Sequence, residues 1–134
     1  MNHPVKRKSL WKEAILHKSD IICAQETHFS KDSPPQCSHR NFPKVFTANA
    51  NTKTKGVLTA IRDTVTFSLH TELADPGGRY LILVCDINSV TYTIVNVYAP
   101  NAHQMCFFKK LMRKVQPIKR VSLYCAGTLT LCLM

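Results

Sequence analysis

Apolar residues follow two different periods along this chain, one typical of helices and one typical of strands. Residues 5–17 and 104–115 carry them at three- and four-residue spacing, which predicts a helix in each range. Apolar and β-branched runs predict strands at 21–25, 44–48, 56–61, 65–70, 79–87 and 90–97. Residues 118–134 are apolar enough for one more strand and a tail. The apolar stripes of the two helices consist of Leu10, Trp11, Ala14, Ile15 and His17, and of Phe107, Phe108, Leu111 and Met112.

Turn-forming residues separate these elements. Prolines at Ser33-Pro34-Pro35 and Asn41-Phe42-Pro43 exclude a helix or a central strand between residues 26 and 43. Asp75-Pro76-Gly77-Gly78 predicts a tight turn, and Asn88-Ser89 predicts a second one. The order is helix, strand, loop, several strands joined by short turns, then helix. This order predicts an α/β or α+β fold with a mostly antiparallel sheet.

The net charge of the chain limits the classes of partner that it favours. The 134 residues amount to a single domain and include 18 basic against 8 acidic residues, for a formal net charge of +10. Such an excess favours a polyanion, either nucleic acid or an anionic membrane surface, and a solvated lysine face is the alternative. The longest apolar stretches fall well short of a membrane span, so we expect no membrane partner.

The cysteines and the N-terminal residues indicate where in the cell the protein is expected. None of the six cysteines forms a Cys-x-x-Cys pair, which argues against a zinc ribbon or a thioredoxin-type site and favours a reducing, intracellular setting. Lys6-Arg7-Lys8 is not followed by an apolar core, so it is not a secretory signal. The same cluster is either a weak nuclear address or a solvated helix face. We expect an intracellular protein, nuclear if functional.

Four short motifs follow one another in a specific order. They are Gln25-Glu26-Thr27-His28, Lys55-Gly56-Val57, Asp75-Pro76-Gly77-Gly78-Arg79-Tyr80 and Asn96-Val97-Tyr98-Ala99-Pro100-Asn101. The first places a carboxylate at the C-terminal end of a buried strand, where catalytic groups of α/β proteins commonly lie. In this order the motifs resemble the endonuclease/exonuclease/phosphatase family, and more narrowly the endonucleases of LINE-type (non-LTR) retrotransposons. The resemblance covers about residues 5–115.

The resemblance implies a fold and an activity. The fold is a four-layer α/β sandwich, in which two β-sheets pack together between outer helices. The activity is hydrolysis of a DNA phosphodiester with Mg²⁺ as cofactor, which makes DNA, through its phosphate backbone, the expected partner. No obligate protein partner is indicated.

The resemblance also assigns roles to residues. Glu26 would bind the metal, because a hard cation prefers carboxylate oxygens; the alternative is a solvated carboxylate at a strand end. Tyr98 and Asn101 would line the catalytic cleft beside the scissile phosphate; the alternative is a core tyrosine on a strand ended by proline. Lys53, Lys55 and Arg79 are candidates for contacts to backbone phosphates, although exposed lysines are common on any surface.

Other family motifs have no counterpart. The sequence has no acidic residue after Asp86, and Ala126-Gly127-Thr128-Leu129-Thr130 stands where the family has Gly-Asp-Phe-Asn. Suitable codons for this segment spell Gly-Asp-Phe-Asn in a shifted frame, so a frame displacement between Val115 and Cys125 is our hypothesis, and the coding nucleotides test it. We therefore expect residues 1–117 to be a partial domain with an incomplete second half, and residues 118–134 to be a divergent tail.

Three functions stay open at this point. The chain is a fragment of a magnesium-dependent endonuclease, inactive because key residues are missing. Alternatively it is a basic module that binds nucleic acid without catalysis, or a translated retroelement pseudogene with no function. Half of a two-sheet sandwich would also expose a large apolar sheet face, which predicts aggregation.

Overall fold

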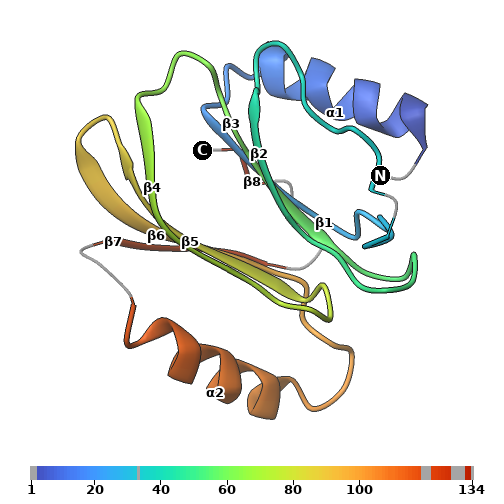
Figure 1. Cartoon of the computed structure of the whole chain (residues 1–134), viewed down its shortest axis with the longest axis vertical. Coiled ribbons are helices and arrows are strands. Elements are labelled where there is room, and N and C mark those ends of the chain that lie inside the picture. Colours follow the sequence, from blue (N-terminus) through green and yellow to red (C-terminus); the bar gives the residue numbers. More distant parts are fainter. Residues whose placement is uncertain (1–2, 33, 119–121, 128–131, 134) are drawn as a thin grey trace.

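The chain has a mixed α and β fold, in which most of the strands lie between the two helices in sequence and the others follow the second helix (Figure 1). The computed structural model describes residues 3–32, 34–118, 122–127 and 132–133, and for the last two segments it describes the backbone path. The elements are α1 (Pro4–Leu16), β1 (Ile21–Gln25), β2 (Lys44–Ala48), β3 (Val57–Ile61), β4 (Phe67–Ala74), β5 (Tyr80–Ile87), β6 (Val90–Val97), α2 (Gln104–Val115), β7 (Ser122–Gly127) and β8 (Cys132–Leu133).

The strands form two sheets. Sheet 1 has the order β2-β3-β1-β8, and sheet 2 has the order β4-β5-β6-β7. All neighbouring strands are antiparallel except β6 and β7, which are parallel. They are parallel because the connection through α2 returns the chain to the end of sheet 2 at which β6 begins. The predicted mixed fold with a mostly antiparallel sheet is confirmed.

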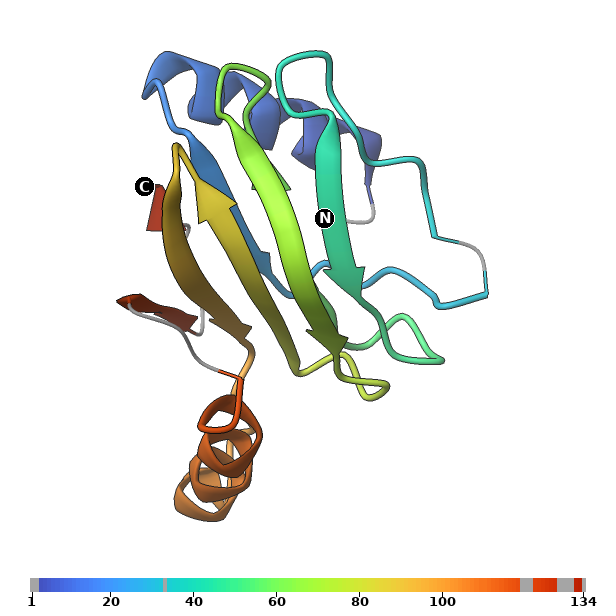
Figure 2. The ribbon, with the colours of Figure 1, turned by 60° about the vertical axis from the view of Figure 1, so that its left-hand side comes forward.

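The two sheets pack face to face, with one helix on each outer side (Figures 1 and 2). Apolar side chains of β1, β3, β5 and β6 form the core between the sheets, among them Ile21, Val57, Leu83 and Ile94. Trp11 of α1 packs on the outer side of sheet 1, and Leu111 of α2 packs on the outer side of sheet 2. In the described residues the inner faces therefore cover each other. The prediction of an uncovered apolar sheet face is wrong. The strands between residues 21 and 97 form both sheets, so each sheet covers the inner face of the other.

Local sequence explains most element boundaries. Strands β1, β2 and β6 and helix α2 have the predicted bounds. Asn88 and Ser89, with φ of 49° and 69°, form the tight turn between β5 and β6. The strand predicted at 65–70 runs instead from Phe67 to Ala74, because a bulge at Leu69/Thr71 lets it continue along β5.

Both helices differ from prediction in the face that they bury. His17 follows the end of α1 and is exposed, so it does not extend the buried stripe. Phe108, predicted in the apolar stripe of α2, is 41% exposed, whereas Leu111 and Val115 are buried. Within the described residues neither helix is long and apolar enough to cross a membrane.

Candidate functional site

Four segments distant in sequence meet at one end of the two sheets: the residues after β1, the β2–β3 loop, the β4–β5 turn and the residues after β6. Thr27 N–H donates to the Gly56 carbonyl, and His28 N–H donates to the Lys55 carbonyl, both at 3.1 Å. Tyr98 N–H donates to the Arg79 carbonyl at 2.6 Å. Backbone hydrogen bonds thus join the first motif to the second and the third motif to the fourth.

The chain turns sharply where β1 ends. Glu26 and His28 have φ of 55° and 58°, a left-handed conformation that non-glycine residues adopt at an energetic penalty. Gly56 opposite has φ of 136°, and a Cβ atom there would overlap the buried Thr27 hydroxyl. Only glycine allows this approach, which explains the Lys55-Gly56-Val57 motif and fixes the backbone on either side of Glu26.

A buried amide side chain links the two sheets next to the candidate site. Asn96, fully buried in β6, donates to the Leu58 carbonyl at 2.8 Å and to the Ala24 carbonyl and Thr59 hydroxyl at 3.3 Å each. Its Oδ1 accepts a hydrogen bond from the Gln25 Nε2 at 2.6 Å. Asn96 therefore ties sheet 2 to sheet 1 at the residue that precedes Glu26.

Three of the predicted site residues form one cluster, which we call the Glu26 cluster: Glu26, Tyr98 and Arg79. The Arg79 guanidinium carbon lies 5.2 Å from the centre of the Tyr98 ring, and its Nη1 donates to the Tyr98 carbonyl at 3.3 Å. Partial burial raises the pKa of the Tyr98 phenol above its ordinary value, and the charge and hydrogen bonding of Glu26 raise it further, against a smaller opposing effect of Arg79. The phenol therefore stays protonated and remains a hydrogen-bond donor.

The other predicted residues lie around this cluster without joining it. Lys53 is exposed and Lys55 is half-buried, both in the β2–β3 loop beside Glu26. Asn101 is exposed three residues beyond Tyr98, and it forms no hydrogen bond to the cluster among the described residues. Contacts among the described residues therefore link Glu26, Tyr98 and Arg79, and the role of Asn101 stays a prediction.

Three contributing residues, His28, Gln25 and Asn96, were not predicted as site residues. His28 lies with Nδ1 3.1 Å from the Lys53 carbonyl and Nε2 3.9 Å from the Glu26 Oε2. Gln25 joins the buried amide network. The signal for Gln25 and Asn96 is present in the sequence, because an amide inside an apolar strand must find hydrogen-bond partners.

The cluster fits part of a metal site. Glu26 offers a carboxylate that is 37% exposed, and Mg²⁺ is commonly bound through one or two carboxylates together with water and phosphate oxygens. Among the described residues no group of three or more His, Cys, Asp or Glu could hold a metal ion. Glu26 is therefore a single exposed carboxylate, and no group of described His, Cys, Asp and Glu residues completes a metal site around it.

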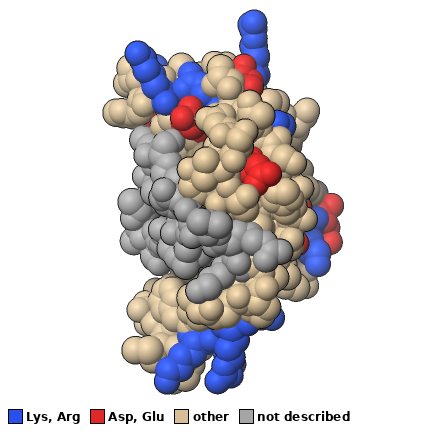
Figure 3. All heavy atoms as spheres, turned by 90° about the vertical axis from the view of Figure 1, so that its left-hand side faces the viewer, with Lys and Arg blue, Asp and Glu red and all other residues tan. Residues whose placement is uncertain are grey.

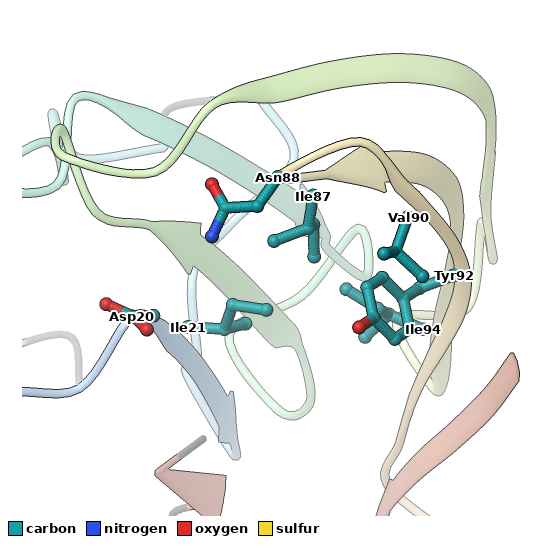
Figure 4. A pocket seen from close by; sticks show the side chains of 7 residues that line it. All are labelled: Asp20, Ile21, Ile87, Asn88, Val90, Tyr92 and Ile94. Carbon is teal, nitrogen blue, oxygen red and sulfur yellow. The ribbon is translucent and has the colours of Figure 1, made fainter.

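A pocket of about 260 Å³ lies at the opposite end of the sheets (Figure 4). It is lined by residues at the start of β1 and β6 and at the β5–β6 turn, among them Asp20, Asn88 and Tyr92. None of the predicted site residues lines it, and most of its lining side chains are apolar. It is an opening into the core between the sheets rather than part of the candidate site.

No protein-family model matches this chain.

Proposed function

We propose that this chain derives from a magnesium-dependent DNA endonuclease of the endonuclease/exonuclease/phosphatase family, of the LINE retrotransposon type. In its present form it would bind DNA through the phosphate backbone without cutting it. The single observation that supports the proposal most is the Glu26 cluster. The resemblance assigned roles to Glu26, Arg79 and Tyr98, which come from β1, β5 and β6, and the three side chains interact.

The layer order supports the same ancestry. The helix, sheet, sheet, helix arrangement is the one that the resemblance implies. The parallel pair β6 and β7 has Val97 beside Gly127, so the ends of both strands lie at the edge that carries Tyr98. The segment that stands where the resemblance expects the family's aspartate continues from Gly127 into Thr128, which lies outside the described residues.

The residues of the cluster are suited to a phosphate. The Arg79 guanidinium supplies positive charge, and the Tyr98 phenol can donate a hydrogen bond to a phosphate oxygen without adding charge. Mg²⁺ bound by Glu26 would neutralise phosphate charge, which is the contribution that a divalent cation makes to phosphodiester hydrolysis. The sequence has no acidic residue after Asp86, so this part of the chain provides no second carboxylate. Binding without cleavage is the expected result.

The experiment measures affinity for a labelled DNA duplex by fluorescence anisotropy, with EDTA and with Mg²⁺. Without metal, Glu26→Gln should bind about threefold more tightly than the unmodified chain, because a carboxylate that repels phosphate is removed. With Mg²⁺, the unmodified chain should gain affinity and Glu26→Gln should not. Glu72→Gln, which removes the same charge from an exposed position in β4, is the matched control and should behave like the unmodified chain.

Two results would contradict the proposal in different ways. Equal behaviour of Glu26→Gln and Glu72→Gln would exclude a role of the Glu26 cluster in DNA binding. Nicking of supercoiled plasmid by the unmodified chain, lost in Glu26→Gln, would support the ancestry and disprove the loss of catalysis.

A second candidate is a basic module that holds nucleic acid through dispersed charge, which the net charge of +10 favours. The two candidates differ in what Arg79 contributes. If the Glu26 cluster binds the phosphate backbone, Arg79→Ala weakens DNA binding several-fold. It also reduces the slope of log affinity against log salt concentration by about one unit, as expected for one lost phosphate contact. In the second, Arg79→Ala has no more effect than Arg40→Ala, which removes an exposed arginine elsewhere. Absence of DNA binding both with EDTA and with Mg²⁺ would favour the translated pseudogene.

A further inference from the structure

Helix α2 buries only part of its apolar surface. Leu111 and Val115 are buried on sheet 2, with Phe107 packed beside them. Phe108 is 41% exposed and Met105 is 70% exposed. The helix of a single small domain usually buries its whole apolar stripe, so this exposed remainder requires a separate explanation.

The exposed apolar residues follow helical spacing. Met105, Phe108 and Met112 lie at i, i+3 and i+7, which places them in one row along the helix. They line a shallow groove of about 420 Å³ together with Lys109, Arg113 and Gln116. We call this surface, made of these six residues, the α2 flank. Methionine side chains are flexible and polarisable and are common on surfaces that receive a partner helix.

The charge beside the row has one sign. Lys109, Lys110, Arg113 and Lys114 belong to α2, and the helix contains no acidic residue. Figure 3 shows lysine and arginine side chains gathered at the end of the molecule where α2 lies. A second copy of this chain, with its own net charge of +10, is therefore an unfavourable partner.

We propose that the α2 flank docks one short amphipathic helix of a partner protein, with apolar residues at three- and four-residue spacing and acidic residues beside them. The row spans about two helical turns, which one face of a short helix can match by ridges-into-grooves packing. The acidic residues of the partner would pair with Lys109 and Arg113, which fixes its orientation and register. This inference does not depend on the proposed DNA-binding function.

The test uses a defined probe. It is a fluorescent 14-residue helical peptide with leucines at a and d positions and glutamates beside them, and the comparison peptide has lysines in place of the glutamates. The full chain should bind the acidic peptide at least about tenfold more tightly than the basic one. Met105→Ser/Phe108→Ser should lose about tenfold in affinity for the acidic peptide, with an unchanged circular dichroism spectrum because both residues are exposed.

Two further variants distinguish specific binding at the α2 flank from non-specific hydrophobic binding. Val5→Ser/Leu16→Ser removes two apolar residues of α1 that are 65% and 71% exposed, and it should bind like the unmodified chain. Lys109→Glu/Arg113→Glu should reverse the preference and favour the basic peptide. DNA binding of Met105→Ser/Phe108→Ser, measured in parallel, distinguishes failure here from failure of the proposed function, because this variant leaves both the Glu26 cluster and the net charge unchanged.

The opposite results would overturn the inference. These are failure to bind the acidic peptide, equal loss of binding in the α1 and α2 variants, or a self-association in sedimentation that Met105→Ser/Phe108→Ser abolishes. Binding to vesicles rich in phosphatidylserine, lost in the α2 variants and accompanied by no peptide binding, would assign the α2 flank to an anionic lipid surface instead.

Discussion

Asn96 determines more of the geometry of the candidate site than any residue that would touch a ligand. Its side chain forms hydrogen bonds with Ala24, Gln25, Leu58 and Thr59, which belong to β1 and β3 of the opposite sheet. A buried amide is tolerated only when its donors and acceptors are satisfied, and here they are satisfied across the sheet interface. Asn96 therefore fixes the position of β1 relative to β6, and with it the distance between Glu26 and Tyr98.

Replacing this amide should destabilise the fold strongly. Asn96→Leu keeps the approximate shape but leaves the Gln25 amide without its acceptor and two strand carbonyls without the Asn96 donor. We expect the free energy of unfolding to fall by about 2–4 kcal/mol. Asn51→Leu, at an exposed position in the β2–β3 loop, is the control and should change stability by less than about 0.5 kcal/mol. Urea denaturation measures both, and a loss of similar size in the two variants would disprove the structural role of Asn96.

At the scale of elements, the bulge in β4 creates a polar contact across three strands of sheet 2. The extra residue, His70, places Nε2 3.0 Å from the Asp86 Oδ2 of β5, and Thr91 of β6 donates to the Asp86 Oδ1 at 2.6 Å. The Thr91 hydrogen bond, followed by the effects of His70, lowers the pKa of the Asp86 carboxyl below its usual range. The ionised form of Asp86 is thus the form that stabilises the sheet.

The direction of the pKa shift sets the pH dependence. The folded pKa of Asp86 lies below its unfolded value of about 3.9, so the stabilisation is present above that pH and is lost as the pH falls through the folded pKa. Thr91→Val should raise the pKa of Asp86 and make the fold less stable at pH 7, and the difference from the unmodified chain should vanish once the pH is well below the folded pKa. Carboxyl carbon NMR titration and urea unfolding check this. Thr71→Val, an exposed change in β4, should leave the Asp86 titration unchanged, and an unchanged titration in Thr91→Val would refute the cross-strand contact.

At the scale of the whole molecule, the two sheets share one core. Residues from both sheets lie between them, including the fully buried Leu83 of sheet 2 and Ile61 of sheet 1. Loss of packing in one sheet should therefore unfold the other as well, because apolar contacts cross the interface.

The single tryptophan allows this cooperativity to be measured. Trp11 belongs to α1 on the outer side of sheet 1, whereas Leu83 belongs to sheet 2. Leu83→Ala should lower stability by about 2–5 kcal/mol and shift the urea midpoint of Trp11 fluorescence and of far-UV circular dichroism equally. Leu69→Ala, at a position 38% exposed in β4, is the control with a much smaller expected loss. A Trp11 transition that Leu83→Ala does not shift would mean that the sheets unfold separately.

Sequence patterns predicted the elements because helix and strand periods are local properties. The strands at 21–25, 44–48 and 90–97 and the helix at 104–115 have the predicted bounds, and the Asp75-Pro76-Gly77-Gly78 turn closes through a hydrogen bond from the Gly78 N–H to the Asp75 carbonyl. The extension of β4 to Ala74 was missed because its bulge depends on pairing with β5, which no local pattern encodes.

The motifs also named three residues that the fold brings together, but they did not show how these residues meet. Glu26, Arg79 and Tyr98 were named from the sequence, whereas the amide network of Gln25 and Asn96 was not. Tertiary contacts alone decided that the inner sheet faces cover each other and that Phe108 is left exposed. Period and composition are properties of neighbouring residues, whereas the burial of a side chain depends on what the rest of the chain packs against it.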